Sequence, residues 1–177
     1  MYLWNVYSND LPENLEAIIA TPVNVEDVIV GELLWGMFRS VFYGSIILMV
    51  ILFFGMIRSP GALLVPFLLF IPGFLFALLA MIFTAFSPSI DFFNYYITLF
   101  ITPMFFFSGI FFPLDRMPEW VRVAAWWTPL YHVVALCRPL IVGGLHKGLW
   151  IHFIWLVVAT VLLFPLPVFL MKRRLIK

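Results

Sequence analysis

Four long apolar stretches constrain this chain more than any other feature of its sequence. They cover residues 33–57, 62–86, 95–112 and 150–171. Each is close to the roughly 20 residues that cross the hydrocarbon core of a bilayer as a helix. In hydrocarbon a segment must satisfy its own backbone hydrogen bonds, so these stretches are expected to be helical. The sequence therefore predicts an all-α membrane protein with about four transmembrane helices.

The composition also indicates a lipid environment. Apolar residues make up 64% of the sequence and charged residues 11%, whereas soluble domains average about 45–50% and about 25%. The net charge of +1 leaves no basic surface for nucleic acid. The single cysteine, Cys137, cannot form a disulfide within the chain.

Basic residues near the ends of the stretches give the expected orientation. Residues 172–177 carry a basic cluster after the last stretch, and such a cluster stays in the cytoplasm. With four spans, the segment before residue 33 lies on the same side. We therefore expect a multi-pass protein of the cytoplasmic (inner) membrane. Basic residues on the outward-facing side count against this orientation: Arg58, Arg116, Arg122, Arg138 and Lys147.

A short amphipathic helix is expected ahead of the first stretch. Asp10 caps its start, and Pro22 ends it because the residue before a proline avoids helical geometry. Its apolar residues recur at helical spacing. Its polar face is acidic, which fits docking on a protein better than binding to anionic lipid. The residues expected at this docking site are Leu11, Glu13, Leu15, Glu16, Ile18 and Ile19.

The region 113–149 is too interrupted for an ordinary span. Pro118 stands at the start of one helix and Pro129 breaks it, while Arg138 and Pro139 interrupt the apolar run that follows. The tryptophans of the first part suit the headgroup layer. We expect an interfacial or re-entrant helical hairpin that faces outward.

Two groups of segments resemble a known family of membrane proteins. Residues 16–23 (EAIIATPV) and 28–32 (VIVGE) are similar to the cytoplasmic segment of type-2 ATP-binding-cassette (ABC) exporter permeases. Residues 107–115 (FSGIFFPLD), 117–120 (MPEW) and 128–132 (TPLYH) resemble the outward-facing signature of the same family. The branch they resemble most includes the nodulation-factor (lipo-oligosaccharide) permeases.

The resemblance implies a six-span unit, so two spans are expected ahead of residue 1. The chain would then be a fragment, have a misplaced start, or be a shortened permease. The resemblance further implies that two permeases pair and that each docks a separate ATP-hydrolysing subunit. Residues 11–32 would be the cytoplasmic coupling segment, with residues 11–20 as the coupling helix. The region near the outer mouth of the substrate path would include Phe107, Gly109, Phe112, Pro113 and Arg138.

No pattern for bond chemistry is recognisable in the sequence. It lacks the Gly-x-x-x-x-Gly-Lys-Ser/Thr loop, so ATP and Mg²⁺ would be used by the partner subunit and this chain would bind no cofactor. The histidines at 132, 146 and 152 lack metal-ligand spacing and are interpreted as interfacial or satisfied core residues. We expect no catalytic, cofactor-binding or metal-binding residue.

A few residues inside or near the apolar stretches need an explanation of their own. Arg39 lies near the start of the first stretch, close enough to the surface to snorkel. Arg138 has two interpretations, an interfacial arginine or a contact to an anionic headgroup or substrate phosphate. The glycines at 31, 36, 44 and 55 are expected to permit close helix packing.

These features favour the permease subunit of an ATP-driven exporter that moves an amphipathic substrate, such as a lipo-oligosaccharide, a polysaccharide or a hydrophobic drug. Its expected partners are an ABC ATPase subunit, a second permease copy and the lipid bilayer, without nucleic acid. Two alternatives stay open. One is an intramembrane lipid-modifying enzyme, which would need carboxylates or histidines converging at the membrane surface. The other is a non-transporting membrane assembly subunit.

Overall fold

The fold is all-helical over the residues that the computed structural model describes, which are 25–87, 92–112, 114–144 and 148–175. This confirms the expected all-α class. Short 3₁₀ turns lie at η1 (Pro60–Leu64) and η3 (Leu114–Arg116), and a π-helical segment forms η2 (Tyr96–Ile101). The α-helices are α3 (Val25–Phe53), α4 (Val65–Leu68), α5 (Phe70–Phe86), α6 (Phe92–Tyr95), α7 (Thr102–Phe107), α8 (Glu119–Trp126), α9 (Pro129–Val142), α10 (Leu149–Leu163) and α11 (Pro165–Leu175).

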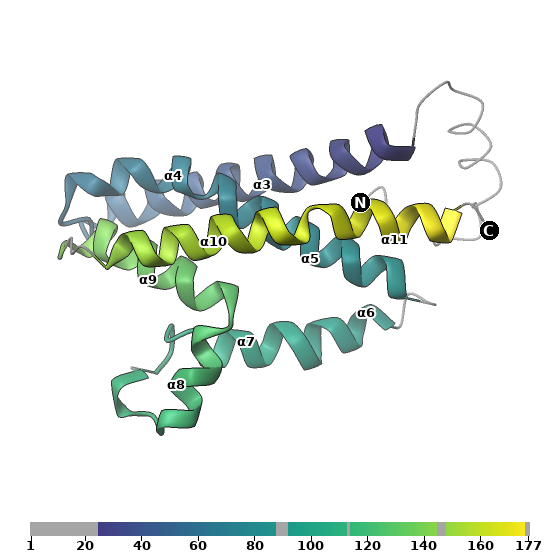
Figure 1. The fold of residues 1–177 in the computed structure, drawn as a ribbon. Helices are drawn as coiled ribbons and strands as arrows, with labels where there is room; N and C mark the ends of the chain where they lie inside the picture. The colour runs from purple at the N-terminus through teal and green to yellow at the C-terminus, as the bar shows by residue number, and fades with distance from the viewer. Residues whose placement is uncertain (1–24, 88–91, 113, 145–147, 176–177) are drawn as a thin grey trace.

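Three helical segments in this part of the chain are long and apolar enough to cross a membrane. They are Glu26–Phe53, Pro60–Phe86 and Leu149–Met171. Figure 1 shows them side by side, as α3, as α4 with α5, and as α10 with α11. α3 begins at Val25, well before the first apolar stretch expected from the sequence. Glu26 and Asp27 lie in its first turn, where negative charges interact favourably with the helix dipole.

The segment expected as a third span, 95–112, ends earlier in the structure. Its helical part closes with α7 at Phe107, and the shorter apolar helix covers Tyr96–Phe107. The chain then turns through Ser108 and Gly109. The φ of Gly109 is +77°, a conformation that glycine adopts without strain. The hydroxyl of Ser108 donates to the carbonyl of Phe105 at 2.6 Å and closes the last turn.

Small residues bring α3 and α5 together. A Cβ placed on Gly36 would lie 2.9 Å from the Cβ of Ala77, and one placed on Gly73 would lie 2.5 Å from the Cβ of Ser40. Gly44 fits against the side chain of Leu69 in the same way. The packing expected of Gly36 and Gly44 is therefore confirmed.

The same expectation is wrong for the other two glycines of the first span. Among the described residues, a Cβ on Gly31 or on Gly55 would meet no atom within 4 Å. Gly55 has a φ of +66° and follows the end of α3, so its role is in the turn. Gly31 lies on the exposed side of α3.

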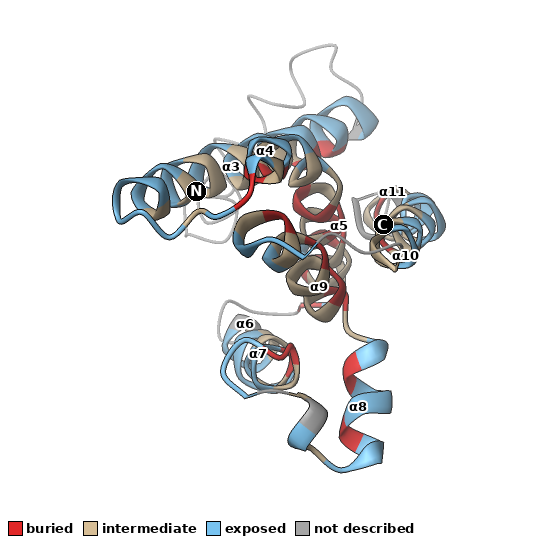
Figure 2. Cartoon of the chain, turned by 90° about the vertical axis from the view of Figure 1, so that its left-hand side faces the viewer, coloured by how far each residue is buried: buried red, intermediate tan, exposed pale blue. Residues whose placement is uncertain are grey.

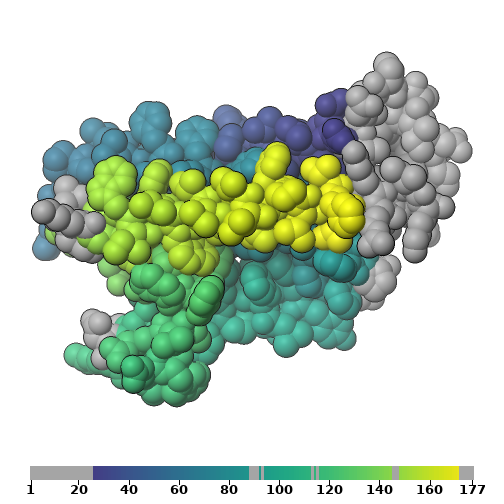
Figure 3. All heavy atoms as spheres, in the orientation of Figure 1, coloured from purple at the N-terminus to yellow at the C-terminus, as the bar shows by residue number. Residues whose placement is uncertain are grey.

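α9 enters the group of long helices instead of lying on its surface. Its Leu136 packs with Leu75 of α5 and Leu156 of α10 in one buried cluster. Figure 2 shows the buried residues concentrated on α5 and α9. The α7–α8 part protrudes from the rest of the molecule, as the space-filling view makes plain (Figure 3). The choice between an interfacial and a re-entrant hairpin for residues 113–149 stays a prediction from the sequence.

Candidate functional site: the turn after α7 and its supports

The turn after α7 gathers the residues that were expected at the outer mouth. Phe107 ends α7, Gly109 is buried in the turn that follows, and Phe112 is exposed beyond it. Pro113 lies outside the described residues. Phe111 contacts the rings of Phe105 and Phe106, with ring centroids 5.5 and 6.1 Å apart. The turn therefore presents aromatic side chains at the end of α7.

Arg138 connects this turn to α9. One of its guanidinium nitrogens donates to the carbonyl of Gly109 at 2.9 Å. The two residues are 29 positions apart, so this hydrogen bond fixes the turn on a different helix. The arginine is exposed, and a guanidinium has five N–H donors, of which this bond uses one. Arg138 thus positions the turn, and its remaining donors could still meet an anionic group.

Two histidines that the sequence did not connect meet between α9 and α10. The Nδ1 atoms of His132 and His152 are 2.8 Å apart, and the Nε2 of His132 is 2.8 Å from the carbonyl oxygen of Trp126. A carbonyl only accepts, so Nε2 of neutral His132 carries its proton. Its Nδ1 is then an acceptor, and the Nδ1–H of His152 donates to it. The expectation of a satisfied core histidine is confirmed for His132, while His146 lies outside the described residues.

Aromatic rings enclose His132. Trp155 stacks on it with ring centroids 4.1 Å apart and an interplanar angle of 13°. Trp126 and Tyr131 meet it edge-on at 5.0 and 5.2 Å. The side chain of His132 is fully buried. Several tryptophans near two histidines are the only signal in the sequence that could have drawn attention to this cluster, because its members come from three different helices.

Burial lowers the pKa of His132, which lies outside the three spanning segments, from 6.5 to about 4. The charge of a protonated His152 acts in the same direction, and the hydrogen bond to Trp126 partly opposes it. Neutral imidazole is therefore the form that the folded protein holds.

A loss of stability in acid follows from this pKa. Between pH 6.5 and pH 4 the unfolded chain binds a proton at His132 that the folded chain excludes, so the free energy of unfolding decreases as the pH falls through this window. Above pH 6.5 His132 is neutral in both the folded and the unfolded chain, so it no longer makes the free energy of unfolding depend on pH. We expect the thermal unfolding midpoint of the detergent-solubilised protein to fall over this range, and His132→Phe to flatten the profile. If the unfolding midpoint of His132→Phe fell equally steeply with pH, His132 would not be the group responsible.

Within the part of the chain that the structure describes, the His132–His152 pair has no third ligand for a metal. No group of three histidine, cysteine, aspartate or glutamate side chains converges anywhere in the described ranges. The contact between the two Nδ1 atoms joins α9 to α10.

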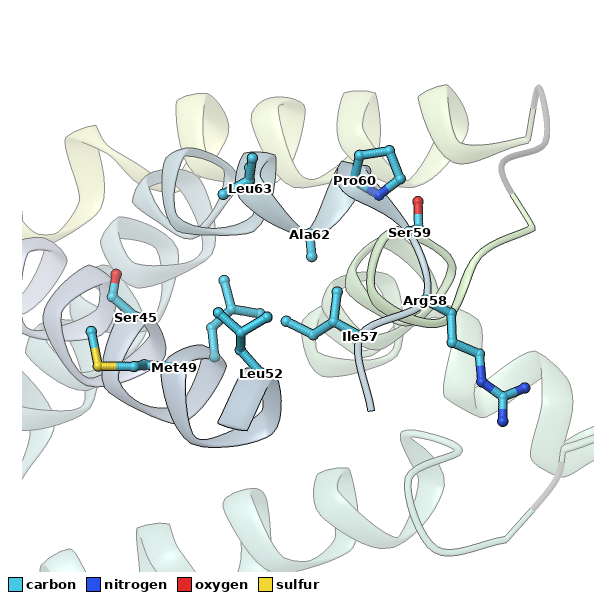
Figure 4. Close-up of a pocket in the computed structure, with 10 residues that line it drawn as sticks. Ser45, Met49, Leu52, Ile57, Arg58, Ser59, Pro60, Ala62 and Leu63 are labelled. Carbon is cyan, nitrogen blue, oxygen red and sulfur yellow. The ribbon is translucent and has the colours of Figure 1, made fainter. Parts of the chain in front are cut away.

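An apolar groove lies where α3 ends and the chain returns through η1. Its volume is about 540 Å³. Figure 4 shows Ser45, Met49 and Leu52 of α3 on one side and Ala62 and Leu63 of η1 on the other. Arg58 lies at its edge with its side chain directed away from these residues (Figure 4). The backbone N–H of Arg58 donates to the carbonyl of Ile141 at 2.9 Å, so α9 also supports this end.

The docking face expected on the coupling helix falls on residues that the structure does not describe. Leu11, Glu13, Leu15, Glu16, Ile18 and Ile19 all precede Val25, the first described residue. Their role therefore stays a prediction from the sequence.

Comparison with known proteins assigns the chain to a family. Residues 12–141 match the family described as ABC-2 type transporter. Nodulation protein J of Sinorhizobium fredii is 34% identical over 161 residues, covering 91% of this chain and 62% of that protein. Nodulation protein J of Rhizobium meliloti is 36% identical over 162 residues, covering 90% and 61%. The inner membrane transport permease YadH of Escherichia coli is 24% identical over 122 residues, covering 69% and 48%.

The chain thus spans less than two thirds of the length of these relatives. No solved structure matches it. The resemblance to the branch of nodulation-factor permeases is confirmed by the relatives. The family match over most of the chain and the three apolar spanning helices together place this protein among the multi-pass membrane components of the ABC-2 type transporter family.

Proposed function

We propose that this chain is the permease subunit of an ATP-driven exporter in the cytoplasmic membrane. The observation that carries the proposal is the match to ABC-2 type transporters over residues 12–141, together with relatives named nodulation protein J that are 34–36% identical. Such a subunit contributes a path through the membrane and performs no bond chemistry.

An amphipathic substrate suits the chemistry of the described surfaces. The turn after α7 exposes aromatic rings such as Phe111 and Phe112, and the groove beside η1 is lined mostly by carbon. Arg138 adds hydrogen-bond donors near the same turn. The aromatic rings and the groove would contact the apolar or sugar parts of a substrate, and Arg138 would contact its polar groups. A lipo-oligosaccharide, a polysaccharide or a hydrophobic drug would suit such surfaces.

Another polypeptide would supply the energy for transport. The sequence has no phosphate-binding loop, so ATP and Mg²⁺ would be bound by an ABC ATPase subunit. That subunit would dock on the coupling helix at residues 11–20, and a second permease copy would complete the path. ATP-driven movement of the ATPase subunits would then be passed to the spans through the coupling segment, residues 11–32.

Loss of the ATPase subunit is the expected result of changing Leu15 and Ile18 together to aspartate. Both side chains belong to the apolar stripe of the coupling helix, and two charges placed there would oppose burial at the interface. Co-purification of the ATPase with the tagged permease should fall by at least about tenfold, which corresponds to roughly 1.4 kcal/mol of binding free energy. Export should fall with it.

The matched control places the same two charges on another side of the same helix, with Asn14→Asp and Ala17→Asp. This control is expected to retain the ATPase. Equal retention by both double variants would contradict the docking role, and equal loss would show a general effect of negative charge on the segment.

A further inference from the structure

The face of α3 that turns away from α5 carries a continuous row of aromatic side chains. Gly36 and Ser40 face α5, and Gly44 faces Leu69 just before α5. Trp35, Phe38 and Phe42 fall on another side of the helix and are exposed. Their rings stack in sequence, with centroids 5.8 and 6.2 Å apart and interplanar angles of 12° and 16°. Figure 2 shows α3 at the edge of the helix group, with much of its surface exposed.

Arg39 lies within this row. Its guanidinium carbon is 5.2 Å from the centroid of the Trp35 ring, a cation–π contact. The side chain is exposed. Across the described ranges no acidic side chain or carbonyl is hydrogen-bonded to it. Stacking on an aromatic face leaves the edge of a guanidinium, with its N–H donors, available to an anion.

The depth of Arg39 in the span restricts what that anion can be. An arginine facing hydrocarbon is unfavourable, so such residues turn toward the polar interface or toward a polar partner. Side chains on a helix tilt toward its N-terminus, and the guanidinium indeed lies over Trp35, one turn closer to Glu26 and Asp27. From Trp35 back to Glu32 is a rise of only about 4.5 Å at 1.5 Å per residue. Because Glu32 is the last acidic residue before the apolar stretch that begins at Leu33, we infer that the guanidinium lies near the phosphate layer of the leaflet at the N-terminal end of α3.

We propose that Trp35 and Arg39 form a binding site for the phosphate-bearing headgroup of an anionic phospholipid in that leaflet. The guanidinium binds the phosphate oxygens through its free edge, because arginine and phosphate match in geometry and charge. The stacked rings of Phe38 and Phe42 lie beneath, where they contact the upper part of the acyl chains. This site is independent of the transport activity proposed above and can be tested without an ATPase or a substrate.

The test measures which lipids the protein retains. The full chain is reconstituted in nanodiscs that contain equal parts of phosphatidylglycerol and phosphatidylcholine, and the lipids that stay bound are counted by native mass spectrometry. We expect phosphatidylglycerol to be enriched by about fivefold over phosphatidylcholine, as one well-placed basic residue near a charged leaflet provides. Arg39→Gln should reduce this ratio to near one, and Arg39→Lys should retain part of it.

Arg58→Gln is the matched control, because it removes one exposed arginine at the opposite end of α3. It is expected to keep the enrichment. An unchanged ratio in Arg39→Gln would overturn the site, and an equal loss in Arg58→Gln would reduce it to a general effect of net charge. Trp35→Leu supplies a second variant in which the charge stays and the stacking partner is gone. A full ratio in that variant would exclude Trp35 from the site.

Discussion

Replacing Gly73 with leucine is expected to separate α3 from α5 and to cause a large loss of stability. A Cβ at this position would lie 2.5 Å from the Cβ of Ser40 and 3.3 Å from the backbone of Met37. The Cβ of Ser40 is fixed to its backbone and cannot rotate away, so the two helices must shift apart. Overpacking of this kind costs about 3 kcal/mol, and it would also disturb the buried cluster around Leu33 and Leu78.

The measurement is the thermal unfolding midpoint of the purified protein in detergent, followed by tryptophan fluorescence. A decrease on the order of 10 °C is expected, given about 2–4 °C per kcal/mol for a chain of this size. Gly31→Leu is the control, because a side chain there meets nothing within 4 Å. If both variants lost stability equally, the cause would be helix propensity or leucine itself and not the α3–α5 contact.

Replacing either histidine of the His132–His152 pair should cost stability, and the losses from the two single changes should not add. His132→Phe keeps a ring that can stack on Trp155 but removes the donor to the Trp126 carbonyl and the acceptor for His152. Each buried polar group that loses its partner costs about 1–3 kcal/mol. We therefore expect a loss of about 3 kcal/mol in the free energy of unfolding.

The double variant His132→Phe with His152→Phe is the decisive comparison. With both imidazoles replaced by apolar rings, the hydrogen bond between the two Nδ1 atoms loses its donor and its acceptor together, and the Trp126 carbonyl loses its donor as it does in His132→Phe. We expect the double variant to be more stable than the sum of the two single changes indicates, by 1 kcal/mol or more. Strictly additive losses would mean that the two histidines are not coupled, and the hydrogen bond between their Nδ1 atoms would then carry no stability.

Much of the secondary structure follows from the sequence because hydrophobic length is a local property. The apolar stretches predict helices, and the structure has helices there. The close packing of Gly36 and Gly44 could also be predicted, since a small residue within a membrane helix usually marks a contact with another helix. The same reasoning failed for Gly31, because the sequence does not tell which side of a helix faces its neighbour.

The tertiary structure alone decided how distant residues combine. Arg138 meets Gly109 across 29 positions and His132 meets His152 across 20, and neither pair follows a spacing rule because each contact joins separate helices. The insertion of α9 beside Leu75 and Leu156 is of the same kind. The sequence by itself determined that this chain is helical and apolar enough for a membrane, since that depends on the composition of each segment. Which polar groups would be paired inside it depended on how those segments pack.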